Sequence, residues 1–217
     1  EASVRDGTVT AGSVHGGVVV GLFDGFAPQP TLGGLLGLDL LLSGDLVFLP
    51  GDQGFDGSAF AWGYGVRLGI LRESFTLPGI TLSATRRHGD DVAVRPPGSS
   101  TEVSLRDMTT ISLRGEVGKE LWGLGFLVGA GWDRYEADAA LRLDGISGGN
   151  PELGLSTAGF EADRALFFAG VSRTFVVWQL AGEFGWARGF GDGSADVPAF
   201  DAGEGSLFGT VSLRLTL

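Results

Sequence analysis

The sequence predicts an all-β protein: an antiparallel, up-and-down β-barrel that crosses a membrane. Two observations predict this fold class. Long stretches alternate bulky apolar residues with small or polar ones, and no apolar run approaches the ~20 residues that a membrane-spanning helix needs. The mean hydropathy of the 217 residues is +0.22. Such a chain can cross a bilayer only as a closed barrel, because closure pairs every backbone group within the apolar layer.

The clearest alternation lies between Trp122 and Trp132. The even positions of this stretch are bulky and apolar, whereas most odd positions are glycine. In a strand the two sets point to opposite faces. Ten residues at about 3.3 Å each, tilted by about 40°, place the two indoles about 25 Å apart in height. That distance matches the apolar band of an outer-membrane barrel, which aromatic girdles bound on both sides.

The same alternation recurs in residues 60–70 and 176–190, so all five tryptophans lie on predicted apolar faces. The direction of each strand fixes the depth of its tryptophan in the membrane. The five tryptophans can therefore be assigned to the two girdles. We expect the periplasmic girdle to contain Trp122 and Trp178, and the outer girdle to contain Trp62, Trp132 and Trp186.

The apolar runs predict nine strands within one domain. Tight turns at 118–119 and near residue 174 alternate with long polar loops at 88–100, 143–158 and 191–204, an asymmetry that is typical of outer-membrane barrels, whose short turns are periplasmic. An even strand number is usual, so residues 1–11 are assigned to an N-terminal segment or extra strand, and residues 12–217 to the barrel. We predict ten strands, with eight as the alternative. The nine ranges are 12–23, 34–48, 58–72, 78–88, 101–117, 120–143, 159–174, 175–190 and 205–217.

The last eleven residues, LFGTVSLRLTL at 207–217, alternate to the end of the chain. With this segment and its repeated hairpins, the chain resembles the small monomeric outer-membrane barrels of Gram-negative bacteria, the class of OmpA-like and OmpW-like proteins, over about residues 12–217. It departs from that class by ending in Leu217, where an aromatic residue is usual. The resemblance implies the bacterial outer membrane as the location, and lipid, lipopolysaccharide and other envelope proteins as partners.

Charged residues gather on the predicted inner face. Ionised side chains of both signs in a narrow lumen must pair, because an unpaired buried charge costs several kcal/mol. Strand 159–174 is apolar on both faces around Phe167, so its charged residues are not assigned to the inner or the outer face. The expected lumen network consists of Asp39, Arg67, Glu102, Arg106, Arg114, Glu116, Glu183 and Arg214.

This network allows two functions. It can act as a polar plug, which leaves the barrel as a structural anchor or interaction protein. Alternatively, it can line a narrow pore or a conduit for a small or hydrophobic ligand, because the many inward glycines leave space. A soluble carrier is disfavoured, since its bulky apolar face would have to point inward. Residues alone do not separate the first two functions.

Several other functions are excluded or disfavoured. The net charge of −11 leaves no basic stripe for nucleic acid, and the absence of cysteine excludes disulfides and thiol catalysis. The only histidines, His15 and His88, have no recognisable nucleophile, so we expect no enzyme activity and no cofactor. An acidic loop offers weak candidates for a metal site: Asp192, Asp196 and Asp201.

Overall fold

The computed structural model describes residues 12–26, 34–49, 57–95, 101–147, 150–189 and 205–215. The extra strand predicted within residues 1–11 lies outside the described residues, as do the metal candidates Asp192, Asp196 and Asp201. No helix among the described residues is long and apolar enough to cross a membrane.

The prediction of an all-β antiparallel protein is confirmed. Eight strands lie within four residues of the predicted ranges, because strict two-residue alternation marks both their position and their faces. The strand predicted at 159–174 begins earlier, at Asn150, and the short strand Val92–Val94 was not predicted. The strands are β1 (Gly12–Phe23), β2 (Leu35–Phe48), β3 (Ser58–Leu71), β4 (Gly79–Gly89), β5 (Val92–Val94), β6 (Thr101–Leu121), β7 (Leu124–Ser147), β8 (Asn150–Phe175), β9 (Trp178–Ala187) and β10 (Ser206–Leu215).

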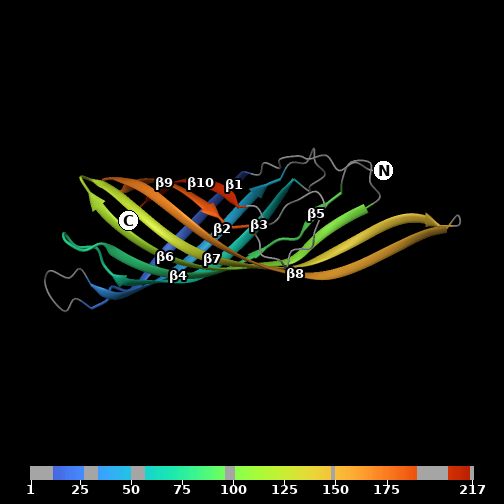
Figure 1. Cartoon of the computed structure of the whole chain (residues 1–217), viewed down its shortest axis with the longest axis horizontal. Coiled ribbons are helices and arrows are strands. Elements are labelled where there is room, and N and C mark those ends of the chain that lie inside the picture. The colour runs from blue at the N-terminus through green and yellow to red at the C-terminus, as the bar shows by residue number, and fades with distance from the viewer. Residues whose placement is uncertain are drawn as a thin grey trace.

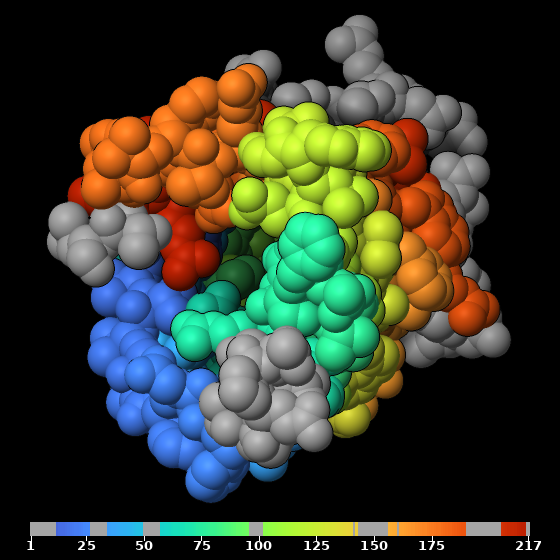
Figure 2. Space-filling model, turned by 90° about the vertical axis from the view of Figure 1, so that its left-hand side faces the viewer, coloured from blue at the N-terminus to red at the C-terminus, as the bar shows by residue number. Residues whose placement is uncertain are grey.

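The strands form one strongly curled sheet (Figure 1). Nine of them follow one another in the order β1-β2-β3-β4-β6-β7-β8-β9-β10, and the short β5 pairs with β6 beside this path. Viewed along its length, the sheet winds around a central hollow (Figure 2). Within the described residues, no backbone pairing joins β1 to β10. The sheet is therefore a curled half-barrel, and a closed ten-stranded barrel is not established.

The region predicted as a long loop at 143–158 is a hairpin instead. Strands β7 and β8 pair without interruption from Leu124 opposite Arg173 to Ser147 opposite Asn150. Their far ends project well beyond the rest of the sheet (Figure 1). The prediction was wrong because ladder pairing uses backbone groups alone, so it continues through residues whose side chains do not alternate.

A second correction concerns Trp122, which was placed on a strand face. It forms a two-residue turn with Gly123 between β6 and β7, with φ angles of 54° and 77°. Positive φ at both positions is the geometry of a type I′ hairpin. The indole is 94 % exposed at the tip of this turn. Val176 and Val177 make the corresponding turn between β8 and β9.

The two faces of the sheet differ sharply. Large apolar side chains are exposed on every strand of the nine-strand path, whereas only four apolar side chains among the described residues are buried: Ala162, Leu166, Phe168 and Ala187. All four come from β8 and β9. The usual apolar core is therefore small, and most apolar surface lies on the convex face.

Candidate functional site

The concave face of the sheet holds a buried ion-pair cluster, which we call the Asp133 cluster. Asp133, on β7, is 3 % exposed. Its carboxylate lies 3.1 Å from Nη2 of Arg114 on β6 and 3.8 Å from Nη2 of Arg164 on β8. The hydroxyl of Tyr135 donates to Asp133 at 3.1 Å and accepts from Arg164 at 2.7 Å. Three adjacent strands are thus joined by charge-assisted hydrogen bonds, which are stronger than neutral ones.

Further ion pairs line the first strands of the same face. The Asp45 carboxylate, on β2, lies 2.6 Å from Nδ1 of His15 on β1 and 3.1 Å from Nε of Arg87 on β4. Closer to the end of the sheet that carries the short turns, which we call the turn end, Arg67 of β3 lies 2.8 Å from Asp39 of β2. Strand register explains both sets, because Asp39 faces Arg67 directly and His15 faces Asp45.

An apolar cluster covers the opposite part of the concave face. Leu166, Phe168 and Ala187 are buried together, with Leu127 and Phe208 packed against them. This resolves the strand that the sequence left ambiguous. Leu166 and Phe168 point inward, and Phe167 points outward, where its ring stacks on Trp186 with centroids 6.4 Å apart.

The inward glycines in this region are covered by neighbouring side chains. A Cβ added at Gly129 would fall on the ring of Phe168, and one added at Gly185 would fall on the ring of Phe208. Gly131 is covered in the same way by the Arg114 side chain. The expectation that inward glycines leave space for water or ligand therefore fails in this part of the lumen. Here the absence of a side chain makes room for a ring or a guanidinium group from the next strand.

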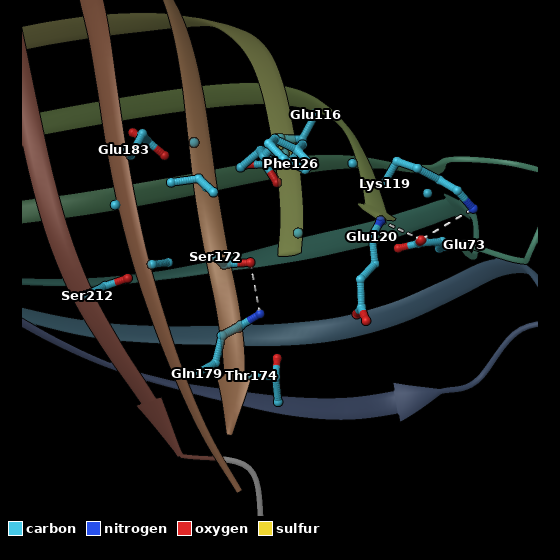
Figure 3. A pocket seen from close by; sticks show the side chains of 18 of the residues that line it. Glu73, Glu116, Lys119, Glu120, Phe126, Ser172, Thr174, Gln179, Glu183 and Ser212 are labelled. Atoms are coloured by element: carbon cyan, nitrogen blue, oxygen red, sulfur yellow. Dashed lines mark hydrogen bonds and ion pairs between the residues drawn. The ribbon is translucent and has the colours of Figure 1, made fainter. Parts of the chain in front are cut away.

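At the end that carries the short turns, the concave face opens into a cavity of about 410 Å³ (Figure 3). We call it the turn-end vestibule. It is lined by hydroxyl and amide groups and by four carboxylates: Glu73, Glu116, Glu120 and Glu183. Gln179 donates to the Ser172 hydroxyl at 3.3 Å, and Thr81 donates to Glu116 at 3.3 Å. The arrangement offers mainly hydrogen-bond acceptors and negative charge, and Leu127 lies at its inner limit.

The only lysine in the chain fixes the rim of the vestibule. Lys119 of β6 donates to backbone carbonyls in the connection between β3 and β4, including that of Phe75 at 3.0 Å. It also lies 3.5 Å from Glu73, whose carboxylate accepts from the Glu120 backbone N–H at 2.7 Å (Figure 3). These contacts hold the β3–β4 connection against the end of β6, next to the β6–β7 turn.

The structure brings together only part of the predicted lumen network. Asp39 pairs with Arg67, and Arg114 joins the Asp133 cluster. Glu116 and Glu183 line the vestibule. The register places Arg214 beside Gln179 on the same face, and no ion pair joins it to another described residue.

Glu102 and Arg106 do not lie on the concave face with the rest. A bulge at Asp107, with φ of 51°, adds one residue to β6 between Arg106 and Thr109. One extra residue reverses the faces of everything before it. Glu102 pairs instead with Arg95, next to β5. Two-residue alternation cannot reveal such a bulge, because both sides of it alternate correctly.

Three functional partners were missed by sequence reasoning: Asp45, Tyr135 and Arg164. The first could have been found, because Asp45 shares the parity of Asp39 on β2 and lies opposite His15. Tyr135 could also have been found, because it shares the parity of Asp133 on β7. Arg164 depended on the face of β8, which alternation alone left open.

The two histidines contact different polar partners. His15 is held by Asp45, and His88 lies on the convex face, where Nδ1 contacts the Thr109 hydroxyl at 3.3 Å. The neighbouring Asp90 and Asp91 accept backbone N–H groups at 3.3 Å rather than meeting His88. Within the described part of the chain, no group of three or more metal-binding side chains converges.

The predicted girdle tryptophans lie on the convex face, apart from Trp122 in its turn. Trp62 is stacked on Tyr64 with centroids 5.9 Å apart and lies 5.2 Å from His88. Trp178 opens β9 beside the Val176–Val177 turn, and Trp186 closes the same strand. Trp132 faces Leu113 across the β6–β7 pair.

We find no match to this chain among protein-family models, curated proteins or solved structures.

Proposed function

We propose that the chain is an outer-membrane β-barrel that acts as an anchor or interaction protein, with a lumen blocked by its own side chains. One observation carries this proposal: apolar side chains are exposed over the convex face, while charged groups pair on the concave face. Soluble monomers rarely expose contiguous apolar patches above a few hundred Å². Lipid is the solvent that suits such a convex face, and ion pairs suit a narrow interior.

The dimensions of the apolar band support this environment. On β7 the outward residues from Leu124 to Trp132 span about 20 Å in height at a 40° tilt, close to the ~25 Å of an outer-membrane band. Among the described residues of β4 and β6–β8, outward-facing charges lie by register at its ends. Lys119 and Arg173 lie toward the turns, whereas Arg86 and Arg134 lie toward the long connections. Arg134 donates to the carboxylates of Glu136 and Glu161, so the charge of this boundary residue is paired.

The turn end carries exposed apolar tips. Phe75, Trp122 and Val176 lie in three connections at the same end of the sheet and are 98 %, 94 % and 98 % exposed. Trp122 and Val176 also hold positive φ angles that bulky side chains rarely adopt. Turns that project into water favour Asn-Gly or Asp-Gly. These tips support contact between the turn end and the headgroup layer, where Trp122 can still serve as a girdle residue.

Closure of the barrel is part of the proposal. Every neighbouring pair along the nine-strand path is antiparallel, so β1 and β10 run in the same direction. Open edges in lipid would leave backbone N–H and C=O groups unpaired, which membranes do not tolerate. An extra strand from residues 1–11 between the two edges would make ten strands and keep the alternation. Direct closure would require one parallel pair.

The blocked lumen rests on the Asp133 cluster and the apolar cluster around Phe168. Together they extend over β6–β10, and their side chains occupy the space above the inward glycines. In barrels of eight to ten strands the interior is narrow enough for side chains to fill it. A lumen filled in this way fits the proposed role of anchoring and partner contact.

A narrow pore is the second candidate. The turn-end vestibule favours it, because an acidic cavity of about 410 Å³ could admit a small cation or solute at one end. The buried clusters beyond Leu127 argue against through-flow.

Two measurements test the proposal. Refolding into lipid vesicles should give a protein that floats with the lipid, whereas a monodisperse protein in plain buffer would contradict the membrane role. Planar-bilayer recording should then show little or no current for the unmodified chain and discrete openings after Arg114→Ala. Stable ion-selective openings in the unmodified protein would favour the pore.

A further inference from the structure

The convex face carries an apolar groove across β3, β4, β6 and β7, with a volume of about 570 Å³. Small residues form its floor: Ala84, Gly115 and Ala130. Larger side chains form its walls, and they are Val66, Leu68, Leu82, Leu113 and Trp132. The register explains the shape, because the rows Val66–Ala84–Leu113–Trp132 and Leu68–Leu82–Gly115–Ala130 are adjacent across the four strands.

A cationic row borders one end of the groove. The next outward row toward the long connections is Tyr64–Arg86–Ile111–Arg134. Arg134 is already engaged by Glu136 at 3.1 Å and by Glu161. Arg86 is exposed, and it forms no ion pair within the part of the chain that the structure describes. A cation without a partner on an otherwise apolar face is unfavourable in lipid unless it meets an anion at the interface.

Aromatic side chains lie on one side of Arg86, and Tyr64 is directly opposite it across the β3–β4 pair. Trp62 and Tyr64 stack on each other, and the His88 ring lies 5.2 Å from Trp62 and 6.4 Å from Tyr64. Their exposed faces suit a flat apolar surface such as one side of a sugar ring. The groove, the arginine and the aromatic cluster follow one another along the strands. They offer sites for an alkyl chain, a phosphate and a sugar in that order.

We propose that this groove binds a phosphorylated glycolipid, the chemistry of lipopolysaccharide, with one acyl chain in the groove and its phosphate on Arg86. The inference rests on the proposed membrane role. The short turns are expected on the periplasmic side and the long connections on the outer side. Arg86 lies toward the long connections and therefore toward the outer leaflet. That position favours a glycolipid over the phospholipids of the inner leaflet.

The test uses the full chain in detergent micelles and native mass spectrometry, with a defined short-chain lipopolysaccharide as the probe. The unmodified protein should retain one glycolipid. Arg86→Gln should lower retention at least tenfold because the phosphate loses its cation, and Ala84→Leu should do so because it fills the floor of the groove.

Two matched controls lie outside the groove. Arg106→Gln removes another exposed arginine, and Gly182→Leu adds bulk on the convex face of β9, where an added Cβ meets nothing within 4 Å. Both should retain the glycolipid as the unmodified protein does. Each variant is first checked for heat-modifiable migration, which reports a folded barrel.

Three outcomes would overturn the inference. They are no retention by the unmodified protein, equal loss in all four variants, and undiminished retention of dephosphorylated probe. Equal retention of phosphatidylglycerol would overturn the glycolipid assignment. A protein that inserts into vesicles but retains no lipid contradicts this inference alone, whereas a protein that does not insert contradicts the proposed function.

Discussion

The two faces of this sheet are built from the same strands and have opposite chemistry. On β7, Val128 and Ala130 point to the convex face among exposed apolar neighbours, while Gly129 and Gly131 lie beneath Phe168 and Arg114 on the concave face. In a soluble sandwich the apolar face is the core. Here the apolar face is the larger exposed surface, and the buried interior is mainly ion pairs with a small apolar cluster. The comparison teaches that the surroundings of the sheet, rather than its strand pattern, decide which face is inside.

The largest expected effect comes from breaking the buried Asp133 cluster. Asp133→Ala leaves Arg114 and Arg164 without their carboxylate, and removal of one partner of a buried ion pair costs about 3–5 kcal/mol. Asp39→Ala is the matched comparison, because the Asp39 side chain is 27 % exposed, against 4 % for Asp133, and it pairs with one arginine rather than two. Its cost should be about 1 kcal/mol or less. Urea titrations of vesicle-bound protein measure both, and equal costs would contradict the distinction between the two pairs.

The convex face gives the next largest effect. Val128 lies midway between the turn end and Trp132, so Val128→Arg should destabilise the folded protein by about 2–4 kcal/mol in lipid. Leu215→Arg, which faces outward beside Trp178 at the turn end, should cost about 0–1 kcal/mol because arginine reaches the interface there. Folding titrations into vesicles compare them. A cost that does not depend on depth would argue against a lipid-facing surface.

The inward glycines predict a smaller effect. Gly129→Ala places a Cβ on the Phe168 ring and near the Gly115 carbonyl, and overpacking of this kind costs about 1–3 kcal/mol. Gly182→Ala on the convex face meets nothing within 4 Å and should change the unfolding free energy by about 0.5 kcal/mol at most. Adding Phe168→Leu should recover part of the Gly129→Ala loss. A lumen that is empty above Gly129 would make the two glycine variants equivalent.

The turn tips predict the smallest effect on stability. Because the Trp122 side chain is almost fully exposed, Trp122→Ser should change the unfolding free energy by about 1 kcal/mol or less. In a variant that retains Trp122 as its only tryptophan, brominated lipids should quench it most strongly when the bromines lie near the headgroups. Strongest quenching by bromines at the bilayer centre would contradict the turn-end placement.

Much of this fold could be predicted because alternation with a period of two fixes both the position and the faces of a strand. The outward residues of β3, β7 and β9 and the inward pairing of Asp39 with Arg67 follow directly from it. The β7–β8 extension could not be predicted, because it depends on backbone pairing beyond the apolar band. The bulge at Asp107 was hidden for a related reason, since alternation is intact on both sides of it.

The candidate site was less predictable than the fold. Charge alternation places ionised residues on one face, but it does not tell which cations meet which carboxylates across several strands. Arg114 pairs with Asp133 rather than with a predicted glutamate because β6 and β7 set that register. The filling of the lumen by Phe168 depended on the face of β8, which is apolar on both sides and therefore carries no periodic signal.

The central claim is that the convex face meets lipid and the concave face does not. Comparing labels at two adjacent residues of one strand, which point to opposite faces, tests it most directly. The chain has no cysteine, so a single cysteine can be placed at Val128 or Leu127, at Val171 or Ser172, and at Val211 or Ser212. Each variant carries a small fluorophore, is refolded into vesicles and is exposed to brominated lipid. The account predicts strong quenching at Val128, Val171 and Val211 and weak quenching at their neighbours. Equal quenching within each pair, or the reverse pattern, would contradict it.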